Sequence, residues 1–290
     1  MKKEKPKPYY GISCLHDRKQ MQDILTYVKA KKITGRRIMA GTHMSSASFR
    51  GFEVEHPKRT LRLDEVRSIY SSIERPKQRG PDRDWFDANV FRVVQFNSEG
   101  PAVIDAELLL VNQMIHIPDG GREVNVIDQF VEGFQINHAL PNPDKLRWFR
   151  DKQMWRNMQI ILQLGELAME ETGNDPEGLA VLVESYGDAI DYVLWDGSED
   201  HQAVFDAEFA RPYLRAIREH CPDLGIAVSG NLGPNSMRLV DPLRAEFPDL
   251  SVDAESELRD ENDSLLMAKA LSYLDECAKR WEKKINIEDC

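Results

Sequence analysis

The amino-acid sequence predicts a single α/β domain folded as a (β/α)8 barrel. The C-terminal third carries three consecutive strand–loop–helix units, with short apolar strands expected at Tyr192–Asp196, Leu224–Gly230 and Leu250–Asp253. Repeated units of this kind imply parallel strands covered by helices. The chain has 290 residues, and a barrel of this type takes roughly 250 residues, which leaves room for insertions. Alternating apolar and amphipathic stretches continue through the rest of the chain.

The first three strand–helix units are expected in the N-terminal third of the chain. Their strands and helices are predicted, in chain order, at Tyr9–Leu15, Arg18 to about Lys31, Arg37–Gly41, Leu63–Ser72, Val90–Phe96 and Val103–Met114. Thr42–Thr60 forms a long polar loop after the second strand, too long for an ordinary βα connection. We expect it to cover the catalytic end as a lid, with a surface or dimer-contact loop as the alternative. A charged connection rich in Pro and Gly spans Arg75–Asp84.

The later elements follow the same alternation. Gly120-Gly121 marks a turn, and Val124–Val131 fits either a strand or a helix. The remaining strands and helices are predicted at Gly133–Ile136, Asp144–Trp155, Gln159–Leu164, Pro176–Tyr186, Ala207–His220, Met237–Phe247 and Ser264–Trp281. We expect residues 1–8 to be a disordered tail, residues 9–282 to form the barrel, and residues 283–290 to form a C-terminal tail.

Composition and charge exclude several classes of function. The net charge of −11 argues against a nucleic-acid-binding surface, because neutralising phosphates requires clustered Lys and Arg. No apolar run approaches the roughly 20 residues of a membrane span. Lys and Pro fill the first ten residues, so no signal peptide is visible and we expect a cytoplasmic protein. The four cysteines show neither metal-site spacing nor a disulfide framework.

Polar side chains gather at the C-terminal ends of the predicted strands, where barrel enzymes carry their sites. Asp196 ends the sixth strand, Gly230–Gly233 follows the seventh, and Asp253–Glu257 begins at the end of the eighth. Other strand ends supply His16, Asp17, His43, Asn97, Asn137, His138 and Glu166. These residues can serve acid–base chemistry, or else cap helices and bind loops, as we expect of Asp17. No metal-site spacing is present, so we expect no metal.

Four segments carry the pattern of a known family. Val94-Gln95-Phe96 stands where the third strand of that family reads VQLHG, and Asp196 with Phe205-Asp206 matches its sixth strand. Ser229–Asn235 matches in part the seventh-strand pattern AGGL-x-P-x-N, and Val252–Leu258 aligns with VDVSSGVE of the eighth. The chain therefore resembles phosphoribosylanthranilate isomerase, a TIM barrel of tryptophan biosynthesis. The likeness lies mainly in the C-terminal third.

The resemblance implies an Amadori rearrangement by acid–base catalysis, in which an aminoaldose phosphate becomes an aminoketose. It makes Asp196 the general acid and places the base on the first strand, where the family has a cysteine. An alignment without gaps puts Ser13 at that position and Cys14 next to it. Neighbours on a strand face opposite sides, so only one of the two can face the pocket.

A phosphorylated substrate would need backbone N–H groups in the loops after the seventh and eighth strands. The resemblance assigns phosphate binding to Gly230, Asn231, Gly233 and Ser256, with Arg259 as a nearby cation. Glu255 and Glu257 also stand in the second loop, and like charges near a phosphate weaken its binding. The sequence therefore leaves open whether the substrate carries a phosphate.

The leading hypothesis is an isomerase that acts on a small molecule, with a sugar phosphate as one candidate substrate. The other residues expected to bind substrate are Gln95, His43, His138 and Glu166. We expect no cofactor, no nucleic-acid or membrane partner, and a monomer or homodimer. One alternative is a barrel without chemistry that serves as a binding or scaffold protein. Another is a metal-dependent hydrolase or lyase built on His16, His43, His138 and Glu166.

Overall fold

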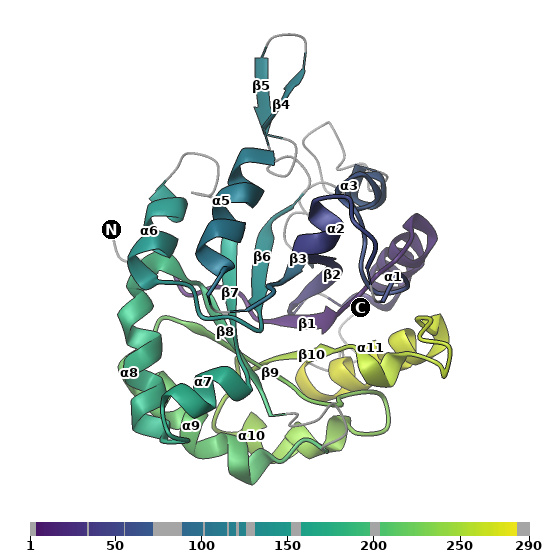
Figure 1. Cartoon of the computed structure of the whole chain (residues 1–290). Coiled ribbons are helices and arrows are strands. Elements are labelled where there is room, and N and C mark those ends of the chain that lie inside the picture. The colour runs from purple at the N-terminus through teal and green to yellow at the C-terminus, as the bar shows by residue number, and fades with distance from the viewer. Residues whose placement is uncertain are drawn as a thin grey trace.

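The computed structural model forms a closed barrel of parallel strands. It describes residues 4–33, 35–54, 56–71, 89–100, 102–114, 116–119, 122–125, 131–151, 158–197 and 204–282. The barrel strands are β1 (Tyr9–Ile12), β2 (Arg37–Ser45), β3 (Val90–Asn97), β6 (Gly133–Asn137), β7 (Gln159–Leu164), β8 (Tyr192–Asp196), β9 (Gly225–Ser229) and β10 (Ser251–Ala254). They pair in the order β1-β10-β9-β8-β7-β6-β3-β2 (Figure 1). The predicted (β/α)8 barrel is confirmed.

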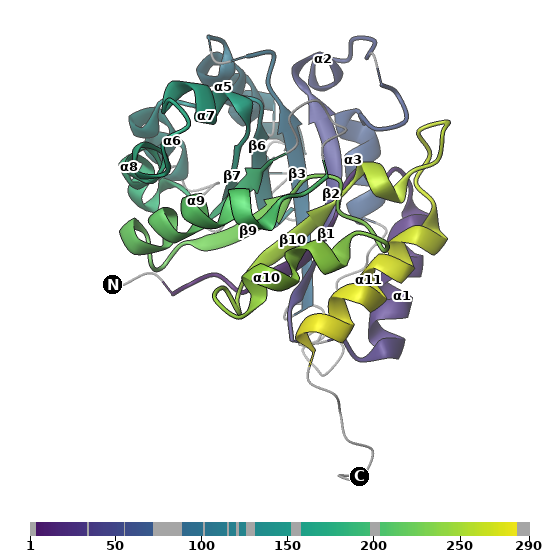
Figure 2. The ribbon, with the colours of Figure 1, turned by 90° about the horizontal axis from the view of Figure 1, so that it is seen from below.

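Helices surround the barrel on its outer face (Figure 2). They are α1 (Arg18–Lys31), α2 (Ser46–Phe49), α3 (Leu63–Ser71), α5 (Ile104–Met114), α6 (Pro143–Asp151), α7 (Glu166–Glu171), α8 (Pro176–Tyr186), α9 (Ala207–His220), α10 (Asp241–Arg244) and α11 (Met267–Trp281). Local signals explain the helix starts that the sequence located. Asp17 accepts a hydrogen bond from the N–H of Gln20 at the start of α1, and Asp175 caps α8 with Pro176 in its first turn.

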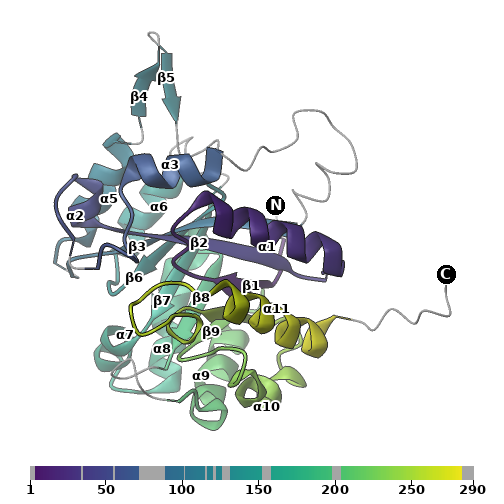
Figure 3. The same ribbon diagram turned by 90° about the vertical axis from the view of Figure 1, so that its right-hand side faces the viewer.

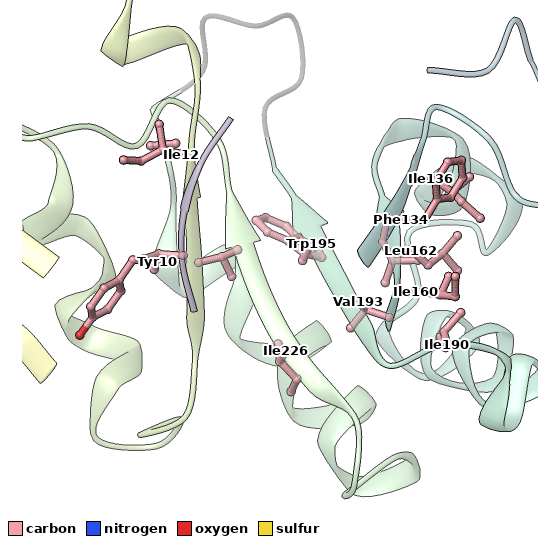
Figure 4. Packing of buried hydrophobic residues seen from close by; sticks show 14 of the residues in the cluster. Tyr10, Ile12, Phe134, Ile136, Ile160, Leu162, Ile190, Val193, Trp195 and Ile226 are labelled. Carbon is pink, nitrogen blue, oxygen red and sulfur yellow. The ribbon is translucent and has the colours of Figure 1, made fainter. Parts of the chain in front are cut away.

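The outer faces of the strands and the inner faces of the helices share one apolar layer. Alternate residues of each strand point outward, as the two-residue period of a strand requires. Val193 and Trp195 of β8 and Ile226 of β9 belong to this layer, part of which Figure 4 shows. The residues between them point into the barrel, so the same strands also build its interior.

The region after the second strand differs from the predicted loop. β2 continues past Gly41 to Ser45 because its last residues pair with β3, with His43 opposite Gln95. α2 follows directly and begins with a capping box between Ser45 and Ser48. This pairing depends on the neighbouring strand, so the polar composition of Thr42–Thr60 gave no sign of it.

Further elements interrupt the predicted alternation. α7 begins directly after β7 and was not predicted. β4 (His116–Asp119) and β5 (Arg122–Asn125) pair as an antiparallel hairpin that projects from the barrel (Figure 3). The predicted turn at Gly120-Gly121 and the connection Arg75–Asp84 lie outside the described residues, as does the end of the helix predicted to reach Trp155.

The helix predicted at Met237–Phe247 is divided. A 3-10 turn, η3 (Met237–Val240), precedes the short helix α10. Pro242 lies in the first turn of α10, where its missing N–H group is tolerated. A continuous helix would need that N–H group, so the proline explains the division.

The segment before β1 is tied to the barrel, although we expected a disordered tail through residue 8. The ammonium group of Lys5 lies 2.6 Å from the carboxylate of Asp249. The hydroxyl of Tyr192 donates a hydrogen bond to the carbonyl of Lys7 at 2.6 Å. Residues 1–3 and 283–290 lie outside the described residues. No helix in the described part of the chain combines the length and apolar character needed to cross a membrane.

Candidate active site

A cavity of about 300 Å³ opens at the C-terminal ends of the barrel strands. An apolar cluster fills the interior of the barrel, and its Leu194 also lines the cavity. The cluster consists of Tyr9, Met39, Phe91, Val93, Ile161, Tyr192, Leu194 and Ala227. The wall of the cavity is lined by His43, His56, Arg59, Thr60, Gln95, Asn97, Gln135, Asn137, His138, Gln163, Leu194, Asp196, Ser229, Gly230, Asn231, Leu232, Asp253, Glu255 and Ser256. The volume lies at the lower end of the range of about 300 to 1,000 Å³ for small-molecule sites. The lining is mostly polar, with three carboxylates among many amides.

Asp253 of β10 is the most deeply buried carboxylate of this lining. The hydroxyl of Ser13 lies 2.8 and 2.9 Å from its two carboxylate oxygens and donates to them. The side-chain amide of Gln95 donates to the Ser13 oxygen at 2.6 Å. Asp253 is 5% exposed, Ser13 1% and Gln95 2%. Gln95 of β3 and Ser13, directly after β1, therefore hold the carboxyl group of β10 in a fixed position.

Two glycines leave the space that this network occupies. A Cβ atom on Gly11 would lie 2.4 Å from the Oδ1 atom of Asp253, which is closer than real Cβ contacts. A Cβ atom on Gly41 would lie 2.8 Å from the Oε1 atom of Gln95. Gly11 lies on β1 next to the strand of Asp253, and Gly41 lies on β2 next to the strand of Gln95. Because neither glycine has a side chain, Asp253 and Gln95 can pack against the backbone of these strands.

Replacing Gly11 with alanine is expected to lower the free energy of unfolding by about 1 to 3 kcal/mol, the usual effect of overpacking a core. Urea denaturation at neutral pH measures this change. Gly165→Ala is the matched control, because a Cβ atom at that position meets nothing within 4 Å. If the two variants lose the same stability, the close approach of Asp253 to Gly11 is not a constraint on the barrel.

The surroundings of Asp253 change its proton affinity. Burial raises its pKa from the ordinary value of 3.8 to about 7, and the nearby charges of Glu255 and Asp196 act in the same direction. The hydrogen bond from Ser13 acts against burial and favours the ionised form. A carboxyl group with a pKa of about 7 can give or take a proton near neutral pH.

Asp196 reaches the same cavity from the end of β8. It is half-buried, and the side-chain amide of Gln163 donates to its Oδ2 atom at 2.6 Å. Its charge is near enough to help raise the pKa of Asp253. The cavity therefore holds two carboxyl groups that interact with each other, one deeply buried and one partly solvated.

A chain of amides covers the opposite wall of the cavity. Gln135 donates to Asn137 at 2.9 Å, and Asn137 donates to Asn97 at 3.0 Å. Gln95 and Gln135 are register partners on β3 and β6. The side-chain oxygens of Gln95, Gln135 and Gln163 are buried and have no hydrogen-bond partner among the described residues. Buried acceptors of this kind are usually satisfied. The oxygen of Gln95 packs toward Gly41, and the oxygens of Gln135 and Gln163 are also buried, so a ligand reaches these two amides only if their side chains turn toward the cavity.

The third carboxylate, Glu255, is held in its ionised form. Burial raises its pKa, but His43, a hydrogen bond from the Cys14 thiol, Arg59 and Arg259 together outweigh burial and leave the pKa below its ordinary value. The guanidinium group of Arg59 lies 3.0 Å from Glu255 and 2.7 Å from Asp263. Arg59 is the one Lys or Arg side chain in the described part of the chain that lines the cavity, and both neighbours are anionic.

The segment around Arg59 partly meets the expectation of a lid. His56, Arg59 and Thr60 line the cavity, and Thr60 forms an isolated bridge with His43. The ammonium group of Lys58 donates to the carbonyl of Asn262 at 2.7 Å. The end of the segment thus extends from β2 to the loop after β10 and borders one side of the mouth.

Only some of the loop residues expected to bind phosphate line the cavity. Gly230, Asn231 and Ser256 line the cavity, and the first two have positive φ values. Gly233 does not line it, and its N–H group already donates to the hydroxyl of Ser236 at 2.8 Å. This assignment needs correction for Gly233, because its amide is not available to an anion.

Arg259 also differs from its predicted role. It folds back as the sequence allowed, but it is 5% exposed and does not line the cavity. Its guanidinium group donates to the carbonyls of Cys14 at 2.9 Å and Asp263 at 2.6 Å. Arg259 therefore holds the backbone after β1 instead of offering a cation to a ligand.

Neither strand-1 candidate is placed to act as the base. Ser13 points into the barrel, as the alignment predicted, but its hydroxyl is committed to Asp253 below the cavity. Cys14 has a positive φ of 59° and is fully buried. Burial and the neighbouring Glu255 raise the pKa of the Cys14 thiol well above its ordinary value. A thiol that resists ionisation is a poor base, and the Ser13 hydroxyl is occupied by its bond to Asp253.

The remaining predicted residues divide between two cavities. His43, His138 and Gln95 line the main cavity. Glu166 lines a neighbouring cavity of about 220 Å³ that shares His138 and Gln163 with the main one. His16 lies apart, with its Nε2 atom 3.0 Å from the carbonyl of Pro57. In the described ranges, no three His, Cys, Asp or Glu side chains are placed to hold a metal ion.

Sequence reasoning missed several of the residues that shape this site. The sequence pattern places Asp253 at a strand end without indicating a chemical role, and it does not point to Gln135, Gln163 or Arg59. The period-two pattern within Gly133–Asn137 and Gln159–Leu164 could have revealed the two glutamines, because each occupies an inward position between outward apolar residues. The role of Arg59 had no comparable local signal.

Comparisons with known proteins add information on the fold. No protein-family model matches the chain, and no curated protein sequence matches it. Its structure is similar to the catalytic domain of a chitinase from Pyrococcus furiosus, with 12% identity, a TM-score of 0.51, and coverage of 97% of this chain and 99% of that chain. It is also similar to phosphoribosylanthranilate isomerase from Thermotoga maritima, with 16% identity, a TM-score of 0.48, and coverage of 93% and 97%. The fold is a TIM barrel. At these identities the likeness extends no further than the fold.

Proposed function

We propose that the chain is an isomerase that moves a proton between adjacent carbon atoms of a small aldose or aminoaldose. Asp253 acts as the general acid and Asp196 as the general base. The observation that carries the proposal is the buried carboxyl group of Asp253, which lines the cavity with a pKa of about 7. Pairs of carboxyl groups in different environments commonly divide the acid and base roles in this way. The resemblance to phosphoribosylanthranilate isomerase supports the reaction class but gave the acid role to Asp196.

The proposed reaction on an aminoaldose whose amino group is on C1 and whose hydroxyl is on C2 needs no external oxidant or reductant. Asp253 donates its proton to the ring oxygen as the bond between that oxygen and C1 breaks, which leaves an iminium group at C1. Asp196 removes the proton from C2 and gives an enaminol. Asp196 then returns a proton to C1, and the hydroxyl on C2 loses its proton to Asp253 as the ketone forms. Both carboxyl groups regain their starting states, and the product has the same formula as the substrate.

Ser13 and Gln95 are positioning residues for Asp253 in this scheme. The Ser13 hydroxyl favours the ionised form of Asp253, so it supports the transfer of the proton to substrate. Gln95 fixes the Ser13 oxygen and has no other role in the proton transfers. The Cys14 thiol takes no part.

Exchange of carbon-bound hydrogen in D₂O tests the proposal directly. We expect the protein to exchange the C2 hydrogen of at least one compound in a panel of aldoses and aminoaldoses, with and without phosphate, as followed by proton NMR. The exchange rate should fall as pH rises above about 7, because Asp253 then loses its proton. Ser13→Ala should move this fall to higher pH, because it removes a hydrogen bond that favours ionised Asp253.

The pH dependence of the exchange rate also distinguishes Asp253 as the general acid from Asp253 as the general base. A rate that falls only on the acidic side of about pH 7 would make Asp253 the base and contradict its role as acid. Exchange that is absent for every compound shown to bind would contradict the isomerase itself.

The alternative of a binding protein keeps one observation in its favour. Neither Ser13 nor Cys14 lines the cavity, although the resemblance places the catalytic base on the first strand. Ligand binding without hydrogen exchange would favour this alternative.

A further inference from the structure

The charges around the cavity are unsuited to a phosphorylated ligand. Asp196, Asp253 and Glu255 all line it. Arg59 is already held between Glu255 and Asp263, both within salt-bridge distance. A phosphate dianion would have to approach the ionised Glu255, and like charges at short range repel each other. His43, His56 and His138 are the other basic side chains of the described lining, and His43 acts electrostatically on Glu255.

The backbone offers no full replacement for the missing cation. The N–H group of Gly233 is occupied by Ser236, whose hydroxyl in turn donates to the carbonyl of Asn231. Arg259 donates to backbone carbonyls outside the cavity. In the loops after β9 and β10, the N–H groups of Gly233, Leu258 and Arg259 are thus occupied by hydrogen bonds within the loops.

Three amide oxygens of the lining are buried without a hydrogen-bond partner among the described residues, as are the Ser229 hydroxyl and the Nδ1 atom of His43. The amide nitrogens of Gln95, Gln135 and Gln163 donate to Ser13, Asn137 and Asp196 in turn. These bonds leave the three amide oxygens without partners among the described residues. Gln135 is 2% exposed and lines the cavity. An unsatisfied buried acceptor costs roughly 1 to 3 kcal/mol, so a ligand that supplies a donor there gains affinity.

We propose that the cavity takes a polyhydroxylated small molecule that carries no phosphate or other anionic group, a neutral sugar or an amino sugar. The inference rests on the proposed function for its site and narrows the substrate class. Hydroxyl groups on adjacent carbons supply several donors at once. Gln135 and Gln163 line the cavity from the neighbouring strands β6 and β7. Neighbouring strands are about 4.8 Å apart, so both amides can turn toward hydroxyl groups of one small ring. An amine would be attracted by Asp196 and Glu255.

Binding measurements by NMR titration test the substrate class without requiring turnover. The probes are D-glucose, D-glucosamine, D-glucosamine 6-phosphate and inorganic phosphate. We expect at least one of the two unphosphorylated sugars to bind, and glucosamine 6-phosphate to bind at least about tenfold more weakly than glucosamine, because of like-charge repulsion. Inorganic phosphate should not compete with the sugar.

Two variants examine the cause of this selectivity. Gln135→Met removes an acceptor with little change of volume and should weaken sugar binding by about threefold to tenfold. Glu255→Gln removes a like charge and releases Arg59 from one partner, so the preference for the unphosphorylated sugar should narrow. Glu184→Gln, an exposed change on α8, is the control and should leave both affinities unaltered.

The outcomes separate this inference from the proposed function. Binding of glucosamine 6-phosphate as tight as that of glucosamine, or no binding of either unphosphorylated sugar, would overturn the inference. Hydrogen exchange on a phosphate ester alone would also overturn it and leave the isomerase standing. Sugar binding without hydrogen exchange would support the inference and contradict the isomerase.

Discussion

Replacing Asp253 with asparagine is expected to lower kcat for C2 hydrogen exchange by about two to four orders of magnitude, the usual loss when a general acid is removed. Asparagine is similar in size and can still interact with Ser13, but it has no proton to donate. The Michaelis constant should change little, because Gln135 and the other amides remain. Steady-state exchange rates measured by NMR on the responding panel compound provide the test.

The controls distinguish the chemistry of Asp253 from a general effect of losing a carboxylate. Asp196→Asn should cause a loss in the same range, because it removes the proposed base. Asp223→Asn, an exposed change just before β9, should retain the parent rate. An Asp253→Asn variant with a rate within about tenfold of the parent would show that another group supplies the proton.

Local signals account for the elements that the sequence predicted well. The bounds of α1, α8 and α9 agree with the prediction because capping residues and a 3.6-residue apolar period mark them within the segment itself. β7 and β8 are likewise short apolar runs with clear ends. The far end of β2 was missed because it depends on pairing with β3, which no local pattern records.

The difference between local sequence signals and tertiary contacts also explains why Asp196 was easier to predict than the role of Asp253. Asp196 was found from sequence because it ends an apolar strand and follows a family pattern. The role of Asp253 depends on Gly11 of β1, Ser13 directly after β1 and Gln95 of β3, which surround it and form its hydrogen bonds. Sequence could place Asp253 at a strand end, but its raised pKa follows from these tertiary contacts.

The buried carboxyl group should also make stability depend on pH. Asp253 has an ordinary pKa of 3.8 and a folded-state pKa of about 7, so the folded protein holds this proton more tightly than the unfolded chain. Between these two values the folded state binds more protons, and its stability therefore falls as pH rises. The contribution is complete below the unfolded pKa and is lost above about pH 7. At 1.36 kcal/mol per pKa unit, the loss is about 4 kcal/mol.

Asp253→Asn isolates this contribution, because the amide does not titrate. The variant should be more stable than the parent at about pH 8, by up to about 4 kcal/mol, and the difference should diminish toward about pH 4. Carboxyl groups whose pKa is lowered in the folded state, such as Glu255 and Asp249, lose their stabilising effect in acid. Most of that loss is common to both proteins and cancels in the difference. Urea unfolding of both proteins across this pH range measures the difference between their free energies of unfolding. If that difference does not change with pH, Asp253 keeps an ordinary pKa in the folded protein.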